Sequence, residues 1–297
     1  MNFLIWFFLV FIVLLLAYFG IGAFIAVTMT RVGEHPQYDQ TPSSFGLDFD
    51  TVAFPSREDG LKLAAWFVPH RGADRAIILV HGRNASKQNA ISGRLPALAA
   101  ALHKAGSNVL MLDLRGHGES EGNRYTFGVY ERRDVLGAVD YLLKKGFTPG
   151  KIALLGISLG GAAVIGAAAR ERAVGALVVE SAFADLIDLV TPNWTKESGL
   201  PMFFLPGVYM MWQILFGFNP KDIKPVEEIA RVAPRPVLIL HSTTDEVIPV
   251  SHAKRLAEAA PQAELVLFEG CDHAELFRDC PQSYLDAVLK FLKDKWR

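Results

Sequence analysis

Cysteine is nearly missing from this 297-residue chain, which contains only Cys271 and Cys280. Two cysteines are too few for a disulfide framework, and they lack the paired spacing of metal sites. We expect two free, partly buried thiols, with a disulfide in an oxidising compartment as the alternative. Hydrophobic residues make up 51% of the chain, so a large core is available without such cross-links.

The chain also lacks an excess of either positive or negative charge. Charged residues make up 21% of the sequence, and the formal net charge is −1. Lysine and arginine are scattered rather than gathered in a stripe, which excludes an extended nucleic-acid interface. No G-x-G-x-x-G follows a predicted strand, which excludes a dinucleotide-binding enzyme of the usual kind.

The longest stretch without charge runs from Phe3 to Thr30. About 20 apolar residues suffice to cross the hydrocarbon core of a bilayer. A cleaved signal peptide, the alternative, requires a basic start, an apolar core of about 7–15 residues and a small-x-small cleavage site. Only Met1-Asn2 precedes this longer run, so we interpret residues 1–30 as an uncleaved, single-pass membrane anchor. The flanking Arg31 and Glu34 do not determine which face carries the rest of the chain.

Residues 31–48 resemble a linker, and residues 49–297 alternate between strand-like and helix-like segments. This alternation predicts an α/β fold with a mostly parallel sheet between helices. An antiparallel hairpin through residues 55–60 is expected at one edge. The predicted strands are Thr51–Phe54, Leu61–Val68, Ala76–His81, Asn108–Asp113, Ile152–Leu155, Ala176–Glu180, Val237–His241 and Glu264–Phe268. The predicted helices are Lys87–Lys104, Val129–Lys145, Leu159–Arg170, Ser251–Ala260 and Pro281–Lys293.

A long insertion, residues 186–225, interrupts the alternation. It contains the apolar segment Leu200–Phe218, for which a second membrane span is one interpretation. Prolines and a glycine oppose a continuous spanning helix, so we favour a lid above the carboxyl edge of the sheet. Phe203 and Trp212 are the substrate-lid residues that we predict.

The segment Gly156-Ile157-Ser158-Leu159-Gly160 lies between a predicted strand and a small-residue helix. A G-x-S-x-G in this context is typical of a nucleophile elbow, where the turn forces the serine into a strained backbone conformation. Serine needs a base to take its proton, so Ser158 predicts a histidine and an orienting carboxylate further along the chain.

Asp245 and His273 each follow a later predicted strand, in the order that the elbow architecture requires. Parallel strands bring such loops to the same sheet edge. Glu246, Asp272 and Glu180 are alternative carboxylates. Backbone N–H groups would stabilise the oxyanion, and we predict Leu159 and Arg83 as their sources, with Asn84 replacing Arg83 as the alternative.

Together these segments resemble the α/β-hydrolase superfamily, from about residue 50 to the end of the chain. The matching motifs are H-G at His81, D-x-R-G-x-G-x-S from Asp113, the elbow, D-x-x-x-P from Asp245 and G-x-D-H ending at His273. Within the superfamily the chain is similar to membrane-anchored abhydrolases and to serine aminopeptidase-like enzymes. The resemblance implies a Ser158–His273–Asp245 triad, no metal and no organic cofactor. We interpret the turn from Asp113 as structural.

The function predicted from these features is that of a membrane-anchored serine hydrolase. It would cleave carboxylic esters or thioesters through an acyl-enzyme, with small-molecule or lipid-like acyl substrates. A serine peptidase or aminopeptidase of the same fold is the alternative within enzymes. A non-catalytic binding protein is less favoured, because all three triad residues are present.

Overall fold

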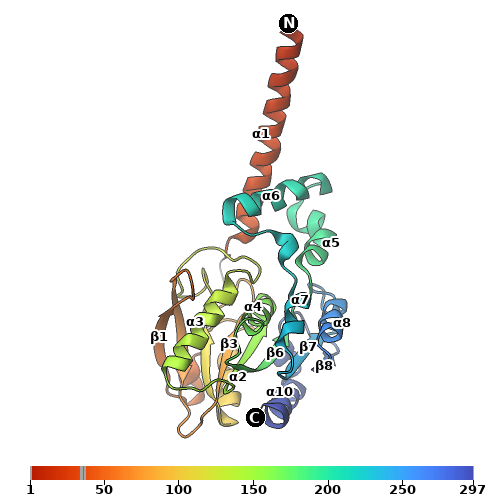
Figure 1. The fold of residues 1–297 in the computed structure, drawn as a ribbon. Helices are drawn as coiled ribbons and strands as arrows, with labels where there is room; N and C mark the ends of the chain where they lie inside the picture. The colour runs from red at the N-terminus through yellow and green to blue at the C-terminus, as the bar shows by residue number, and fades with distance from the viewer. Residues whose placement is uncertain (1, 34–35, 37, 297) are drawn as a thin grey trace. The chain divides into compact units, whose positions relative to one another are not determined.

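The computed structural model describes residues 2–33, 36 and 38–296 (Figure 1). Met1 and Arg297 lie outside the described residues, as do Glu34, His35 and Gln37 of the predicted linker. The chain forms two compact units, which we describe separately. The helical unit comprises Met1–Arg31 and Asp185–Ile223, and the sheet unit comprises Val32–Ala184 and Lys224–Arg297.

The sheet unit contains an eight-stranded sheet in the order β1-β2-β4-β3-β5-β6-β7-β8. The first two strands form the expected antiparallel edge hairpin, β2 also pairs antiparallel with β4, and all later pairings are parallel. The sequence prediction of a mostly parallel sheet is therefore confirmed. The strands are β1 Asp50–Pro55, β2 Lys62–Val68, β3 Ala76–Val80, β4 Asn108–Leu112, β5 Ile152–Ile157, β6 Val174–Glu180, β7 Val237–Ser242 and β8 Ala263–Phe268.

Helices cover both faces of this sheet because the central strands are apolar on both sides. Alternate strand residues, such as Leu79 and Leu155, form one buried cluster with α2 and α10. The opposite face packs against α3 and α4. The helices of the sheet unit are α2 Leu95–Lys104, α3 Glu131–Lys144, α4 Leu159–Ala168, α7 Pro225–Ile229, α8 Val250–Ala259, α9 Leu276–Asp279 and α10 Pro281–Lys295, with short 3-10 turns at Pro42–Phe45 and Ala230–Val232.

One predicted helix begins later than expected. The sequence pattern predicts a helix from Lys87, but α2 begins at Leu95. Ile91, Ser92 and Gly93 have φ angles of 55°, 48° and 80°, a left-handed conformation that a helix cannot contain. Residues 87–94 are therefore turns that lead into the helix.

The helical unit contains α1 Asn2–Thr30, α5 Leu186–Ser198 and α6 Leu205–Phe216, with 3-10 turns at Met202–Phe204 (η2) and Pro220–Asp222 (η3). Asp185 caps α5 by accepting the Ile187 and Asp188 N–H groups, and Gly199 ends it in the left-handed conformation. Among the described helices, α1 is the one that by itself is long and apolar enough to cross a membrane.

Within this unit α6 lies beside the carboxyl-terminal half of α1 (Figure 1). The Tyr18 hydroxyl donates to the Phe203 carbonyl at 2.8 Å and accepts the Gly207 N–H at 3.1 Å. Trp212 Nε1 donates to the Ala26 carbonyl at 3.1 Å. These side chain–backbone bonds fix the helices at two places, one near each end of their contact.

Candidate functional site

Ser158 occupies the sharp turn between β5 and α4. Its φ and ψ angles are 53° and −114°, a strained combination for a residue with a Cβ. A Cβ at Gly156 would collide with the Gly160 carbonyl, and one at Gly160 would collide with the Val80 and His81 carbonyls. Both glycines are therefore required for this turn, and the predicted elbow geometry is present.

The three side chains predicted as a triad lie in hydrogen-bonding contact. Ser158 Oγ is 2.9 Å from Nε2 of His273, and Nδ1 of His273 is 2.7 Å from Oδ2 of Asp245. The residues come from the loops after β5, β7 and β8, where the strands run parallel. A carboxylate at Asp245 favours the tautomer of His273 that carries its proton on Nδ1, and this tautomer would leave Nε2 as an acceptor for the serine proton.

The geometry also separates Asp245 from the alternative carboxylates. Asp272 pairs with Arg278 at 2.7 Å, and Glu180 accepts the Tyr284 hydroxyl at 2.9 Å. Glu246 is exposed, whereas the Asp245 side chain is fully buried. Asp245 is the carboxylate that contacts His273.

Asp245 is held as an anion by its surroundings. Burial alone would raise its pKa, but the hydrogen bond and charge of His273 and the backbone N–H groups of Ile248 and Val247 outweigh burial, so the pKa lies below its ordinary value. Those N–H groups donate to Oδ1 at 2.8 and 2.9 Å, which leaves Oδ2 for the histidine.

A second histidine lies directly behind this carboxylate. His241, at the end of β7, is fully buried, with Nε2 3.5 Å from Asp245 Oδ2. Nε2 donates to the Ile248 carbonyl at 2.8 Å, and burial lowers the pKa of the ring, which favours the neutral form. His241 thus supports the loop that carries Asp245, a role that our sequence analysis missed. Its only signal was a histidine ending an otherwise apolar strand.

Glu180, at the end of β6, is a buried acid next to the site. Burial raises its pKa to about 7, although the Tyr284 hydroxyl and the Leu276 N–H both donate to it. The Glu180 carbonyl accepts the Ser158 N–H at 2.8 Å. Its backbone therefore supports the elbow, while its side chain ties α9 and α10 to the end of the strand.

The predicted oxyanion loop lies against the nucleophile. A Cβ at Gly82 would come within 3.2 Å of the Ser158 Cβ, so this glycine permits the close approach of the loop. The Asn84 N–H donates to His117 Nε2 at 3.2 Å, which engages the alternative donor. The Leu159 N–H belongs to the first turn of α4, where backbone N–H groups have no carbonyl partner in the helix. The predicted role of Leu159 and Arg83 stays a prediction.

The turn from Asp113 is an internal polar network. Buried Asp113 accepts both the backbone N–H and the ammonium group of Lys87, at 2.7 and 2.5 Å. Arg115 forms a bidentate pair with buried Asp134. Gly118 has a φ of 52°, and a Cβ there would collide with the Asp113 carboxylate. These contacts agree with our interpretation of the turn as structural.

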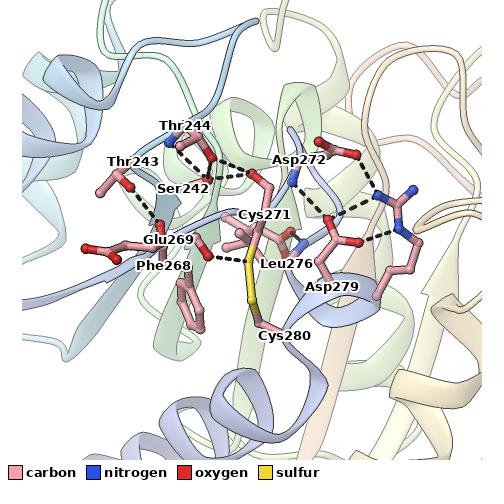
Figure 2. The surroundings of a disulfide bond; sticks show 12 residues. Ser242, Thr243, Thr244, Phe268, Glu269, Cys271, Asp272, Leu276, Asp279 and Cys280 are labelled. Atoms are coloured by element: carbon pink, nitrogen blue, oxygen red, sulfur yellow. Dashed lines mark hydrogen bonds and ion pairs between the residues drawn. A yellow bond between two sulfur atoms is a disulfide. The ribbon is translucent and has the colours of Figure 1, made fainter.

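The two cysteines are joined, which corrects our expectation of free thiols. Cys271 and Cys280 form a disulfide across α9, with their Cα atoms 6.8 Å apart (Figure 2). A sequence separation of nine residues is compatible with two free thiols or with a disulfide. In the structure, the helical turn of α9 brings the two side chains together. The Cys271 carbonyl also accepts the Ser242 and Thr244 hydroxyls, as Figure 2 shows. The loop that carries His273 is thus tied to the loop that carries Asp245.

The two predicted lid residues both lie in the helical unit. Trp212 is fully buried there, and its indole N–H is bonded to α1. Phe203 is 62% exposed, and its ring lies beside Phe204 with centroids 4.2 Å apart. Contact of either residue with a substrate stays a prediction.

Two families of known proteins match the sequence. The family described as "Serine aminopeptidase, S33" matches residues 71–231, and the family described as "TAP-like protein" matches residues 211–295. The first match covers more than half of the chain.

Similar proteins share nearly the full length of the chain. The uncharacterized protein YfhR of Salmonella typhimurium is 28% identical, over 91% of this chain and 88% of its own. The alpha/beta hydrolase domain-containing protein WAV2 of Arabidopsis thaliana is 30% identical, over 88% of this chain and 84% of its own.

Solved structures share the fold. An esterase from Pyrococcus furiosus has a TM-score of 0.73 at 23% identity, covering 90% of this chain and 99% of its own. Est1E from Butyrivibrio proteoclasticus, solved with ferulic acid, has a TM-score of 0.65 at 22% identity, covering 82% and 98%. With an esterase-like α/β-hydrolase fold and a family match over more than half of its length, this chain belongs to the serine aminopeptidase, S33 family of α/β-hydrolases.

Proposed function

We propose that the protein is a membrane-anchored serine hydrolase that cleaves carboxylic ester or thioester bonds through an acyl-enzyme. The observation that carries the proposal is the unbroken chain of hydrogen bonds from Ser158 through His273 to Asp245, at 2.9 and 2.7 Å. A binding protein without catalysis has no need for this alignment.

The reaction follows from these contacts. Ser158 Oγ attacks the acyl carbon while His273 Nε2 takes the hydroxyl proton, and Asp245 stabilises the resulting imidazolium. The N–H groups of Leu159 and Arg83 would donate to the oxyanion. His273 then returns the proton to the leaving alcohol or thiol. Water, deprotonated by the same histidine, releases the acid and regenerates Ser158.

We favour an ester or thioester over a peptide because an esterase from Pyrococcus furiosus is among the structural neighbours. The apolar insertion and α1 favour a lipid-like acyl group. Each buried CH₂ contributes roughly 0.8 kcal/mol, or about fourfold in binding. Activity should therefore rise with acyl length over the first several carbons of a p-nitrophenyl ester series.

The test uses the full-length protein in a mild detergent, with p-nitrophenyl esters, acyl thioesters and aminoacyl amides as substrates. Ser158→Ala, His273→Ala and Asp245→Asn should each lower kcat by about 10⁴-fold or more, because the three groups act as one unit. A fluorophosphonate probe should label the native enzyme but not the Ser158 variant. Ser251→Ala, at an exposed serine on α8, is the control that should keep both activity and labelling.

Two results would overturn the proposal. Unchanged labelling of Ser158→Ala would show that Ser158 is not the nucleophile. Turnover of aminoacyl amides without ester turnover would favour the peptidase alternative. Anchoring is tested separately, since a protein held by α1 resists carbonate extraction and retains Phe3–Thr30 on N-terminal sequencing.

A further inference from the structure

The helix α6, together with η2, exposes an apolar stripe. Phe203, Met210 and Ile214 are 62%, 39% and 64% exposed, and Met202 and Leu215 are 47% and 46% exposed. Residues 203, 206, 210 and 214 recur at helical spacing and therefore share one face. We call Phe203, Pro206, Met210 and Ile214 the outer stripe.

The opposite face of α6 is apolar as well. Leu205, Val208 and Trp212 are buried in the helical unit. No acidic or basic residue occurs from Leu200 to Phe218, and the polar side-chain groups within α6 are the Gln213 amide, the Tyr209 hydroxyl and the Trp212 indole N–H. A surface helix in water carries polar residues on its outer face, and a helix that is hydrophobic all round is typical of a core or a membrane. The outer stripe is not in a core, because it is exposed.

Helix α6 meets α1 through small residues. A Cβ at Gly22 would come within 3.2 Å of the Gly207 backbone carbon, so the two main chains approach closely there. Gly22 and Ala26 lie four residues apart on the buried side of α1. Small residues at this spacing are typical of helix pairs inside membranes, where close backbone approach replaces the hydrophobic effect.

The contacts with α1 determine the depth of α6. A helix rises about 1.5 Å per residue, so α1 is about 43 Å long, whereas the hydrocarbon core is about 30 Å thick. If the core begins at Phe3, it extends to about Gly22. Tyr18, which bonds to Phe203 and Gly207, then lies within it, and Ala26, which bonds to Trp212, lies about 6 Å beyond its boundary, in the headgroup region.

We propose that η2 and α6 form a second membrane-embedded element, seated in one leaflet with the outer stripe against lipid acyl chains. The inference rests on the proposed anchoring by α1. The partner is the bilayer surface because the Phe203 ring lies beside Tyr18 of α1, with centroids 6.3 Å apart, and α1 is itself apolar and exposed. Lys196 and Glu197 before the segment, and Lys221 and Asp222 after it, return the chain to water at both ends. The unit thus enters the membrane with one spanning helix and one shallow helix.

The test measures depth in the full-length protein, reconstituted in phosphatidylcholine vesicles. A single cysteine is introduced at one position at a time and labelled with an environment-sensitive fluorophore under non-reducing conditions, which preserve the disulfide. Phe203→Cys and Ile214→Cys report on the outer stripe. Leu14→Cys reports on α1, and Lys196→Cys is the water-exposed control in the same unit. Thermal melts establish that each variant is folded.

Labels at residues 203 and 214 should be quenched by doxyl-labelled lipids and protected from aqueous iodide, and the label at residue 196 should behave in the opposite way. Iodide quenching at residues 203 and 214, with residue 14 quenched by lipid, would overturn the second element and leave the anchor intact. Iodide quenching at residue 14 would instead show that α1 is not embedded in the membrane, which would contradict the proposed anchor. Protection from both quenchers at residues 203 and 214 would show that protein, such as a second copy, covers the stripe, and would also overturn the proposal.

Discussion

The two units of this protein hold themselves together by different means. The sheet unit buries charges and pairs them, as in Lys87 with Asp113 and Arg115 with Asp134. The helical unit joins two uncharged helices through close backbone approach and three side chain–backbone hydrogen bonds. Paired buried charges demand specific geometry, which suits a unit that holds the Ser158, His273 and Asp245 side chains in contact. Small-residue packing works equally well without water, which suits the unit that carries α1.

Breaking the Lys87–Asp113 pair should give the largest effect on stability. Lys87→Met keeps the length of the side chain but leaves Asp113 buried without its countercharge, which should lower the free energy of unfolding by about 3–5 kcal/mol. Urea unfolding of the full-length protein in one detergent measures the change. Lys151→Met is the matched control. Lys151 Nζ lies 3.3 Å from Asp74 Oδ2, and the Asp74 side chain is 73% exposed. Exposed ion pairs of this kind contribute about 0–1 kcal/mol to the free energy of unfolding. Equal losses in the two variants would contradict the importance of buried pairing.

Glu180→Gln should change how the stability of the sheet unit depends on pH. The pKa of Glu180 is raised by burial from 4.5 to about 7, so the folded protein binds a proton more tightly than the unfolded chain. The stabilisation that the folded protein gains from this proton is complete below pH 4.5 and is lost as the pH rises from 4.5 through 7. The free energy of unfolding falls by about 1.4 kcal/mol per pH unit in this range, or about 3 kcal/mol in total.

The melting temperature of the native protein, measured from about pH 4 to pH 8, should therefore fall relative to that of Glu180→Gln. Glu258→Gln, at an exposed glutamate on α8, is the control and should follow the native curve. Parallel curves for the native protein and the Glu180→Gln variant would show that Glu180 keeps an ordinary pKa in the folded state.

Two glycines of α1 offer a matched pair for the helical unit. A Cβ at Gly22 meets the Gly207 backbone, whereas one at Gly20 meets nothing within 4 Å. Gly22→Leu should therefore separate α1 from α6 and lower the free energy of unfolding by about 1–3 kcal/mol through overpacking. Gly20→Leu adds the same apolar surface without this collision and is the control. Limited proteolysis between Gly199 and Pro220 should accelerate only in the Gly22 variant. Equal cleavage of both variants would mean that close packing at Gly22 does not hold the unit.

The smallest effect is expected from the indole hydrogen bond. Trp212→Phe keeps an aromatic ring but removes the donor to the Ala26 carbonyl, which should cost about 1 kcal/mol. Trp194→Phe is the comparison within the same unit, because Trp194 Nε1 donates to the Pro201 carbonyl at 3.1 Å and does not involve α1. The Trp212 variant alone should increase cleavage at the α1–α6 contact. A similar increase in the Trp194 variant would contradict this specific role.

All eight strands were predicted from sequence, because buried parallel strands are short apolar runs bounded by turns. The triad side chains were predicted in position for a related reason, since each follows a strand and parallel strands end at one edge. His241 was missed because a histidine within a strand has no pattern that separates support of a loop from ordinary burial.

Other features depend on contacts between distant segments. The pairing of Tyr18 with residues 203–207 joins positions 185 apart in the chain, and hydrophobic periodicity carries no information on partners. Similarly, the late start of α2 follows from the left-handed turn at Ile91 and Ser92, two residues that are uncommon in that conformation. The disulfide depends on the turn of α9, which its short sequence does not specify.

The hydrogen bond from Trp212 to the Ala26 carbonyl also means that α1 is part of the folded helical unit and not only the proposed membrane anchor. A peptidase cut near Ala26, or a chain that begins at Val32, would take away the carbonyl that the indole needs and the helix that Gly207 and Val208 pack against. The remaining helices α5 and α6 would then present their inner apolar face to water in addition to the outer stripe. Preparations that lack the first 31 residues should accordingly aggregate, and the enzyme is best handled as an intact chain.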